Sequence, residues 1–437
     1  MKLKIKKWGI NGEGIAYVHK KPIFIDDAIV DELVDGEITE ENDRFGKAKI
    51  KKVLEPSPRR RYPMCGIWKE CGGCPIMHMD MKGQLRMKAA ILQEALRKYA
   101  NYTRPILPII KNPSVLAYRN ACKLRFFNEK GKIEVGLYEK GSNHVIKMER
   151  CLIHEKGLEQ ARSQIVDILN QYDQKAYSKK EECGYRTLVM KEFDRKIQVI
   201  LVTGKMMIEK EIINQIMKID NVVSLWQSVK TKDENEIDIF GYKMIHLAGE
   251  EKMEIGVCGL HLNLLPRSFF QLNTKQAQNL YEVVKAWTPR SKTIVEAYCG
   301  IGAMSLLVAE KAKKVIGIES IEDAVRNAQE NAEKNGTRNV NFICGDAAQE
   351  LKKINKERSI DTLIVDPPRS GLDQPMKETI LHSNIQTIIY VSCNPSTLAK
   401  DLGVLNEKYK IERVQPVDMF SQTPHVECVV LMSRVEK

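Results

Sequence analysis

The chain has 437 residues, a formal net charge of +12 and 43% hydrophobic residues. Its length exceeds the roughly 250–300 residues at which a single core stops growing, so we expect two or three domains. No apolar run approaches the roughly 20 residues of a membrane helix, and the charged start Met1–Lys7 lacks the apolar centre of a signal peptide. These features argue against a membrane protein or a secreted precursor and predict a cytoplasmic globular protein.

Residues 1–56 are predicted to form the first domain. Short alternating runs are separated by turn signals, such as Asn11–Gly14 and Asp35-Gly36. This pattern predicts a small five-stranded barrel of the oligonucleotide-binding type. The following Pro- and Arg-rich segment, residues 55–61, reads as a linker.

Three cysteines follow the linker in the pattern C-x5-C-G-G-C. They are Cys65, Cys71 and Cys74. A disulfide framework is not expected among the eleven cysteines of a cytoplasmic chain, so converging thiolates predict a metal centre. Cys151 is the preferred fourth ligand, with Cys122 and Cys183 as alternatives. The spacing leaves open whether the centre is zinc or an iron-sulfur cluster.

Residues 57–262 are predicted to form a mixed central domain. A helix is expected at about 81–99, with strands including 123–127 and 197–203. Residues 61–130 carry 13 Lys and Arg against 4 Asp and Glu, with aromatic residues interspersed. Basic side chains beside aromatic planes favour a nucleic-acid surface over a merely solvated face.

Residues 263–437 change to alternating strands and helices. The expected strands are 293–298, 314–319, 340–343, 362–366 and 387–392, with a helix at 321–335. This alternation predicts an α/β domain with a doubly wound parallel sheet, whose ligands lie at the carboxyl ends of the strands.

A glycine turn, Tyr298–Gly302, follows the first of these strands. Ser305 stands where a dinucleotide fingerprint would place its third glycine, so no pyrophosphate cradle is indicated. Glu319 ends the next strand, where a carboxylate can accept both ribose hydroxyls. Asp346 follows the third strand and is a candidate partner for the adenine amino group. This set favours S-adenosylmethionine over NAD.

Two further strand ends carry the predicted chemistry. In Asp366-Pro367-Pro368-Arg369 the prolines stiffen the turn, so that Asp366 can be held against a base flipped out of its stack. In Ser392-Cys393-Asn394-Pro395, Cys393 is a candidate nucleophile. A thiolate that adds to carbon 6 of a pyrimidine makes carbon 5 able to attack a sulfonium methyl group.

A base must then remove the proton from carbon 5. Glu427, in His425-Val426-Glu427, is the preferred candidate, and His425 is its competitor.

These motifs, together with Phe269–Asn273, resemble those of the RNA uracil-5 methyltransferase family over nearly the whole chain. The resemblance implies a Rossmann-like class I methyltransferase domain, an N-terminal TRAM barrel and a [4Fe-4S] cluster in the central domain. It also implies that Cys393 is the nucleophile and Glu427 the base. The contacts to S-adenosylmethionine that it implies are Gln271, Tyr298, Glu319 and Asp366; Asp346 is not part of the family's sharpest motifs.

The resemblance implies RNA as the partner, with ribosomal RNA favoured by the basic central section and transfer RNA as the alternative. Pro367 is followed by Pro368, where RNA cytosine-5 methyltransferases typically carry a cysteine. Amine methyltransferases carry an aromatic residue where Arg369 stands. A non-catalytic iron-sulfur RNA-binding module is the alternative from another class. We expect a monomer.

Overall fold

The computed structural model describes residues 1–231 and 238–435, which divide into two compact units. The first unit contains Met1–Trp68, Gly73–Pro113 and Lys275–Lys437, and the second contains Lys69–Gly72 and Ser114–Thr274. The short helix α1 (Trp68–Cys71) lies where the chain passes from one to the other. The expected domain boundaries near residues 56 and 262 stay predictions.

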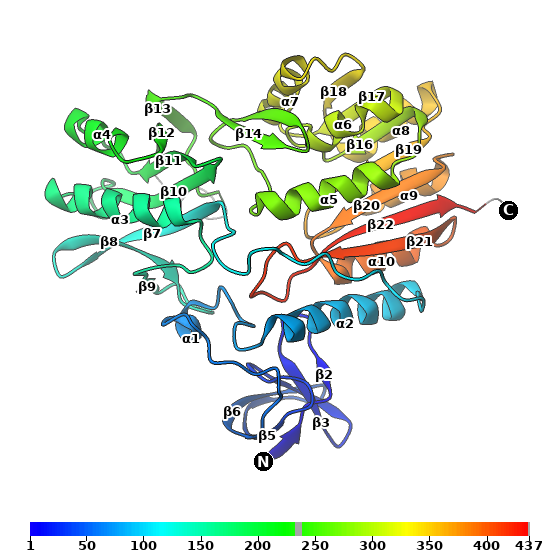
Figure 1. The fold of residues 1–437 in the computed structure, drawn as a ribbon, viewed down its shortest axis with the longest axis horizontal. Coiled ribbons are helices and arrows are strands. Elements are labelled where there is room, and N and C mark those ends of the chain that lie inside the picture. Colours follow the sequence, from blue (N-terminus) through cyan, green and yellow to red (C-terminus); the bar gives the residue numbers. More distant parts are fainter. Residues whose placement is uncertain (232–237, 436–437) are drawn as a thin grey trace. The chain divides into compact units, whose positions relative to one another are not determined.

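The first unit begins with a six-stranded sheet of order β1-β5-β6-β4-β3-β2 (Figure 1). Its strands are β1 (Lys2–Lys4), β2 (Lys7–Trp8), β3 (Gly14–Val18), β4 (Lys21–Ile25), β5 (Leu33–Glu41) and β6 (Gly46–Glu55). The two edge strands, β1 and β2, both come from the first eight residues. Alternate residues such as Leu3, Ile5 and Ile23 are buried between the strands. The assignment of this sheet to a TRAM barrel stays a prediction.

A long helix, α2 (Met81–Ala100), follows the cysteine loop, close to the range expected from the sequence. Asp80 caps it by accepting a hydrogen bond from the Gly83 amide at 2.8 Å, which satisfies one of the amides left open at a helix start. The buried face of α2 includes Leu92 and Leu96, which join a large hydrophobic core of the first unit together with buried residues from the range 295–432.

The rest of the first unit is built on a seven-stranded sheet of order β18-β17-β16-β19-β20-β22-β21. Its strands are β16 (Ser291–Ala297), β17 (Ala312–Glu319), β18 (Val340–Cys344), β19 (Thr362–Val365), β20 (Thr387–Ser392), β21 (Tyr409–Val417) and β22 (Glu427–Arg434). The five expected strands are confirmed and are parallel to one another. Two strands beyond the five expected ones complete the sheet, and it is mixed because β22 runs antiparallel to both β20 and β21. The pattern of β22 did not reveal its direction, since an almost fully buried strand reads as a continuous apolar run in either direction.

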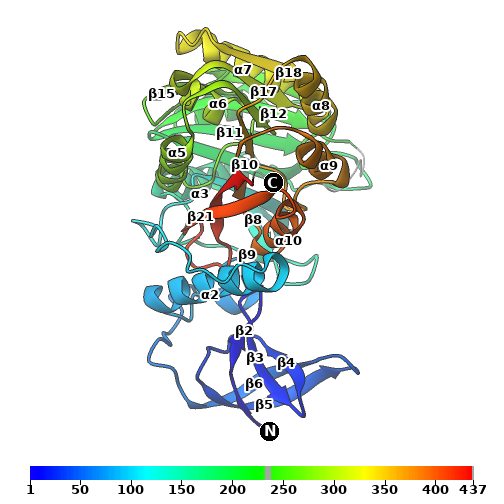
Figure 2. The same cartoon turned by 90° about the vertical axis from the view of Figure 1, so that its right-hand side faces the viewer.

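Helices cover both faces of this sheet (Figure 2). They are α5 (Thr274–Trp287), α6 (Ala303–Leu307), the 3-10 helix η1 (Ala309–Lys311), α7 (Glu322–Lys334), α8 (Ala347–Glu357), α9 (Gln374–His382) and α10 (Pro395–Leu405). Helices α8, α9, α10 and α2 contribute to one core on one face, and α5 lies on the opposite side of the strands. The strands are thus buried on both faces, as in other doubly wound sheets.

The second unit contains a seven-stranded sheet of order β13-β12-β11-β10-β7-β8-β9 and a separate hairpin. The sheet strands are β7 (Ala121–Glu129), β8 (Lys132–Tyr138), β9 (Val145–Lys147), β10 (Tyr185–Phe193), β11 (Lys196–Thr203), β12 (Val222–Val229) and β13 (Lys243–Gly249). The hairpin is β14 (Met253–Val257) with β15 (Leu260–Leu264), and the helices are α3 (Lys156–Gln171) and α4 (Lys210–Met217). In the described ranges, no helix combines the length and apolarity needed to cross a membrane.

Candidate active site

The register of the parallel strands brings several sequence-predicted residues to one edge of the sheet. Ala297 pairs with Ile318 on one side and with Val365 on the other. The next residues along the three strands are Tyr298, Glu319 and Asp366, respectively. They therefore come side by side at the carboxyl edge, where β16 and β19 also mark the reversal of strand order at which such folds bind ligands.

The backbone after β16 is held in an unusual conformation. Tyr298 has φ of +66°, Gly300 of +53° and Gly302 of +81°. A bulky residue in the left-handed region is strained by about 1–3 kcal/mol. At Gly302 a Cβ would also lie 2.6 Å from the Phe342 ring, so the turn requires glycine there for space as well as for φ. This strain marks the turn as a functional element of the fold.

The Glu319 carboxylate is oriented by backbone amides. Oε2 accepts from Gly300 at 3.1 Å, and Oε1 accepts from Ile321 at 3.0 Å and from Ser320 at 2.8 Å. Glu319 is only half-buried, so it is fixed in place and still accessible to a ligand. Asp346 is exposed, and its Oδ1 caps α8 by accepting from the Gln349 amide at 3.0 Å.

A buried acid, Glu296, lies inside β16 just before the turn. It is 1% exposed, and Ser305 Oγ donates a hydrogen bond to its Oε2. Burial raises the pKa of Glu296 to about 8, so the neutral acid is its form at neutral pH. Ser305, which breaks the dinucleotide fingerprint, thus has a structural partner here.

The loop after β19 is tied to the segment after β20. The Arg369 carbonyl accepts hydrogen bonds from Asn394 Nδ2 and from Thr397 Oγ1, both at 3.1 Å. Asn394 also caps α10 by accepting from the Ser396 amide at 3.0 Å. Because one of these bonds comes from Asn394, the residue after Cys393, the Asp366 loop is tied directly to the segment that carries the candidate nucleophile.

A second network, missed in the sequence, is centred on Asp401 of α10. Its Oδ2 accepts from Tyr390 Oη at 2.7 Å and from the Leu372 amide at 2.8 Å, and its Oδ1 pairs with Lys377 Nζ at 3.3 Å. Gly371 passes so close to this carboxylate that a side chain would collide with it. Asp401 thus anchors the far end of the Asp366 loop. A lone acid in an otherwise apolar helix face was the signal that could have found it.

Cys393 lies directly after β20, at the same edge, and is half-buried. Burial, followed by the nearby Glu427 carboxyl, raises the pKa of its thiol to about 11, while Arg369 opposes that rise. The thiol is therefore protonated at neutral pH when no ligand is bound. The sequence pattern assigned no role to Arg369, and the structure places its positive charge beside the Cys393 sulfur.

Glu427 lies across the antiparallel pair from Cys393. Cys428 pairs with Ser392 in the β20–β22 register, so the residues next in line on the two strands are Glu427 and Cys393. Glu427 is 5% exposed. Burial and the neighbouring Asp366 raise the pKa of Glu427 to about 8, against the effect of Arg369 and Lys88. Its competitor His425 has an exposed side chain.

Asp366 completes the group of side chains at this edge. Burial of its carboxyl raises its pKa to about 7. Perturbed acids grouped around a thiol are typical of functional sites. The edge thus unites six of the predicted residues: Tyr298, Glu319, Asp346, Asp366, Cys393 and Glu427.

The remaining predicted residues are divided between the two units. Gln271 belongs to the second unit, where its carbonyl accepts from Asn120 Nδ2 at 3.0 Å. Cys65 and Cys74 belong to the first unit, and Cys71 and Cys151 to the second. In the described part of the chain, no group of three or more His, Cys, Asp or Glu side chains is arranged to hold a metal ion.

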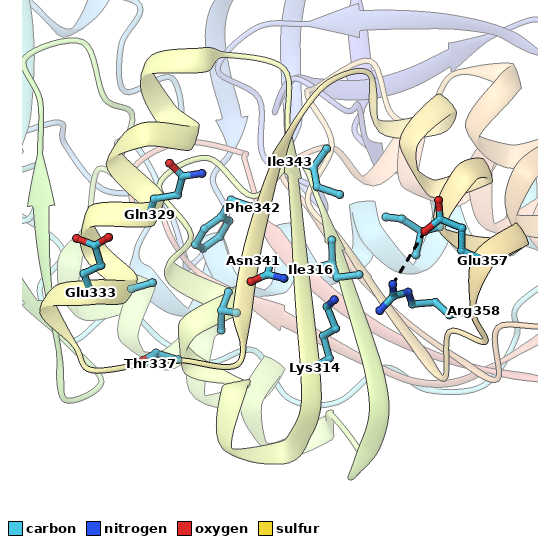
Figure 3. Close-up of a pocket in the computed structure, with 13 residues that line it drawn as sticks. Lys314, Ile316, Gln329, Glu333, Thr337, Asn341, Phe342, Ile343, Glu357 and Arg358 are labelled. Carbon is cyan, nitrogen blue, oxygen red and sulfur yellow. Dashed lines mark ion pairs between the residues drawn. The ribbon is translucent and has the colours of Figure 1, made fainter.

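A hollow of about 540 Å³ lies elsewhere on the first unit (Figure 3). It is lined by β17, β18, α7 and α8, including Lys314 near the start of β17 and Arg358 after the end of α8. Lys314 and Arg358 lie toward the amino ends of the strands. None of the residues that line the hollow is a predicted site residue.

Comparison with known proteins gives a consistent result. A family model described as tRNA (Uracil-5-)-methyltransferase matches residues 80–435. An uncharacterized RNA methyltransferase of Bacillus cereus is 37% identical over 441 residues, which cover 98% of this chain and 96% of that protein. Another from Listeria monocytogenes is 36% identical over 448 residues, which cover 100% and 97%.

A similar fold is found in the tRNA (uracil-54, C5)-methyltransferase of Pyrococcus abyssi, solved in complex with S-adenosyl-L-homocysteine. The TM-score is 0.80, the sequence identity is 24%, and the match covers 99% of this chain and 100% of that one. The whole chain therefore shares that protein's fold.

Proposed function

Because this chain belongs to the tRNA (uracil-5-)-methyltransferase family, an S-adenosylmethionine-dependent RNA methyltransferase family, we propose that it methylates carbon 5 of uridine through a covalent bond to Cys393. The observation that carries this proposal is the placement of Cys393 and Glu427 next to each other across β20 and β22. A nucleophile and a base on facing strand ends can act on adjacent carbons of one ring.

The methyl donor is proposed to bind along the carboxyl ends of β16, β17 and β19. Glu319 has its carboxylate held by amides and accessible, which suits the two ribose hydroxyls of an adenosine. Tyr298 and Asp366 flank it. Asp346 uses one oxygen as a helix cap and retains the other for the adenine amino group, and Gln271 is proposed as a further contact. S-adenosylmethionine supplies the methyl group as a sulfonium.

In the proposed mechanism the half-buried Cys393 thiol gives its proton to water and its sulfur bonds to carbon 6. The electron pair of the 5,6 double bond moves toward the ring carbonyl. Carbon 5 then attacks the sulfonium methyl group, whose bond to sulfur breaks and leaves S-adenosylhomocysteine. Glu427 removes the proton from carbon 5, the double bond re-forms, and the bond from sulfur to carbon 6 breaks. The Arg369 charge favours the thiolate at the first step.

Ribosomal RNA is the substrate that we propose, with transfer RNA as the second candidate. The strongly basic segment 61–130 suits a large folded polyanion, whereas the described activity of the Pyrococcus abyssi protein favours transfer RNA. Mapping of 5-methyluridine in both RNA classes, from cells with and without the gene, decides between them. Loss of the modification from transfer RNA alone would overturn the ribosomal assignment.

We also propose that Cys65, Cys71, Cys74 and Cys151 hold a [4Fe-4S] cluster. The proposal rests on the type and number of the donors, because four thiolates are the usual ligands of such clusters, and Gly72 adopts φ of +64° between Cys71 and Cys74. Protein purified without oxygen should be brown and contain about four irons per chain. A colourless protein that holds zinc would contradict the assignment. The methylation steps proposed above do not pass through this cluster.

The covalent mechanism is tested with RNA that contains 5-fluorouridine. Fluorine at carbon 5 cannot leave as a proton, so the proposed intermediate should persist after methyl transfer as a stable protein–RNA adduct. Peptide mapping should place the bond on Cys393. If the protein methylates the uridine RNA but forms no adduct with the 5-fluorouridine RNA, the covalent mechanism is overturned. If it neither methylates the uridine RNA nor forms the adduct, the non-catalytic alternative is favoured.

A further inference from the structure

Helix α2 contacts the loop that leads into the proposed base. This loop, Asp418–Val426, joins β21 to β22, and Glu427 is the first residue of β22. Most of the loop is buried, with the exposed His425 an exception. A buried loop needs a partner for its polar groups, and several of those partners come from α2.

The first contact is an ion pair. Lys88 is 0% exposed, and its ammonium group donates hydrogen bonds to Asp418 Oδ1 and, at 2.9 Å, to the Phe420 carbonyl. Asp418 directly follows Val417, which is the residue paired with Glu427 across the β21–β22 hairpin. The cation is thus fixed one residue from the strand position that faces the proposed base.

The second contact is a pair of hydrogen bonds between the Gln84 side-chain amide and Gln422. Gln84 Nε2 donates to Gln422 Oε1 at 2.8 Å, and Gln84 Oε1 accepts from the Gln422 amide at 2.9 Å. The Ile76 amide donates to the Gln422 carbonyl at 3.2 Å. Gln422 has φ of +71°, a conformation that costs about 1–3 kcal/mol and persists only where its surroundings fix it. The loop therefore keeps its path because α2 and the segment before it hold Gln422.

The other half of α2 lies against α10, whose first residue follows Cys393 by two positions. Gly403 passes so near the Tyr99 carbonyl that a side chain could not fit there. Asn406 Nδ2 donates to the Ala100 carbonyl at 2.8 Å. One helix outside the α/β repeat therefore touches the elements that bear both proposed reacting groups.

We propose that Lys88 is a positioning residue for proton removal: it fixes the Asp418–Val426 loop and holds a buried positive charge beside Glu427. This inference rests on the proposed function, in which Glu427 is the base. It assigns Lys88 to the step after methyl transfer. Bond formation by Cys393 does not depend on it.

The charges around Glu427 show in which direction loss of Lys88 should move the pKa of Glu427. The ionisable groups that act electrostatically on Glu427, or on which it acts, are Asp366, Arg369, Lys88, Cys393 and Cys428. Burial, then Asp366, raise the pKa of Glu427, and Arg369 and Lys88 counteract them. Loss of the Lys88 charge should therefore leave less Glu427 ionised at a given pH, which slows proton removal unless the pH is raised.

The test is Lys88→Met, assayed in two reactions. With 5-fluorouridine RNA, the variant should form the Cys393 adduct as the wild type does. With uridine RNA in a single turnover, the methylated adduct should accumulate and decay about tenfold more slowly near neutral pH, with its pH profile moved up by about one unit. The control Lys82→Met removes an exposed lysine of the same helix and should leave the decay profile unchanged.

Lys88→Met leaves Asp418 buried without its partner, which can destabilise the fold. The double variant Lys88→Met/Asp418→Asn avoids that unpaired charge, so it tests the role of Lys88 even if the single variant does not fold. It should also show the slow, alkaline-shifted decay, whereas Lys88→Arg should restore the wild-type profile. Decay of the double variant with the wild-type profile, or loss of its 5-fluorouridine adduct, would overturn the role of Lys88. Failure of the wild type to form that adduct would instead overturn the proposed function.

Discussion

The two ends of the seven-stranded sheet of the first unit differ in kind. At the carboxyl end the chain adopts a strained turn at Tyr298, and burial raises the pKa of Asp366 and Glu427. Toward the amino end lies a hollow of about 540 Å³, where Glu357 and Arg358 pair at 4.0 Å on an exposed surface. Space alone therefore does not mark the candidate site. Strain and desolvated charge, which cost free energy, mark it instead.

Cys393→Ala should have the largest effect. Without the sulfur no bond to carbon 6 can form, so methylation should fall by at least about 10⁴-fold. Binding of S-adenosylmethionine, measured by calorimetry, should be retained, because Glu319 and the glycine turn are untouched. Residual methylation near the wild-type rate would remove the covalent step from the mechanism.

Glu427→Gln should have the next largest effect. Amide nitrogen cannot accept the carbon 5 proton, so turnover should fall by about 10²–10⁴-fold. The methylated protein–RNA adduct should accumulate and be visible as a slowly migrating band on a denaturing gel. If turnover falls without an adduct, proton removal is not the blocked step. The same substitution tests the competitor, since activity that persists would favour His425.

The pH dependence of the wild type should give a smaller effect. The base acts as a carboxylate, and the pKa of Glu427 is raised to about 8. Below that value the ionised fraction falls as protons are added, so the rate of adduct decay should rise about tenfold from pH 6 to pH 7 and level off above about pH 8. A rate that is already constant from pH 5 upward would show that the base has an ordinary carboxyl pKa.

Arg358→Ala should have no effect on methylation. Arg358 lies at the hollow, its side chain is exposed, and surface pairs such as its contact with Glu357 contribute little to stability. The measurement is kcat and KM for RNA and for S-adenosylmethionine, compared between the variant and the wild type. A marked loss of activity would mean that the amino end of the sheet also takes part in function, and the contrast between the two ends would fail.

Much of the candidate site was predictable from the sequence, because parallel strands all deliver their last residues to one edge. Tyr298, Glu319, Asp366 and Cys393 each follow an apolar β-rich run, so a local pattern was enough to align them. Glu427 was found through its motif. Its position opposite Cys393 depends on the antiparallel direction of β22, and the apolar pattern of a buried strand does not indicate its direction.

The supporting residues could not be predicted in the same way. Lys88 lies on a helix whose sequence carries several other lysines and arginines, and only the fold shows that this one is buried against Asp418, 330 positions away. Asp401 likewise accepts a hydrogen bond from the Leu372 amide, 29 residues earlier in the chain. Such roles arise from contacts between distant segments, which neither periodicity nor spacing encodes.

The turn at Gly12 has a consequence for the independence of the amino-terminal sheet. Gly12 has φ of +93°, and a Cβ there would lie 2.9 Å from Ile76 and 3.3 Å from Pro424, three residues before Glu427. A chain started after the linker would lose more than the amino-terminal sheet itself. It would also expose Pro424, in the loop that leads to Glu427, where Gly12 now packs. If the amino-terminal sheet and the rest of the chain are produced separately, turnover is therefore expected only when the two pieces reassociate.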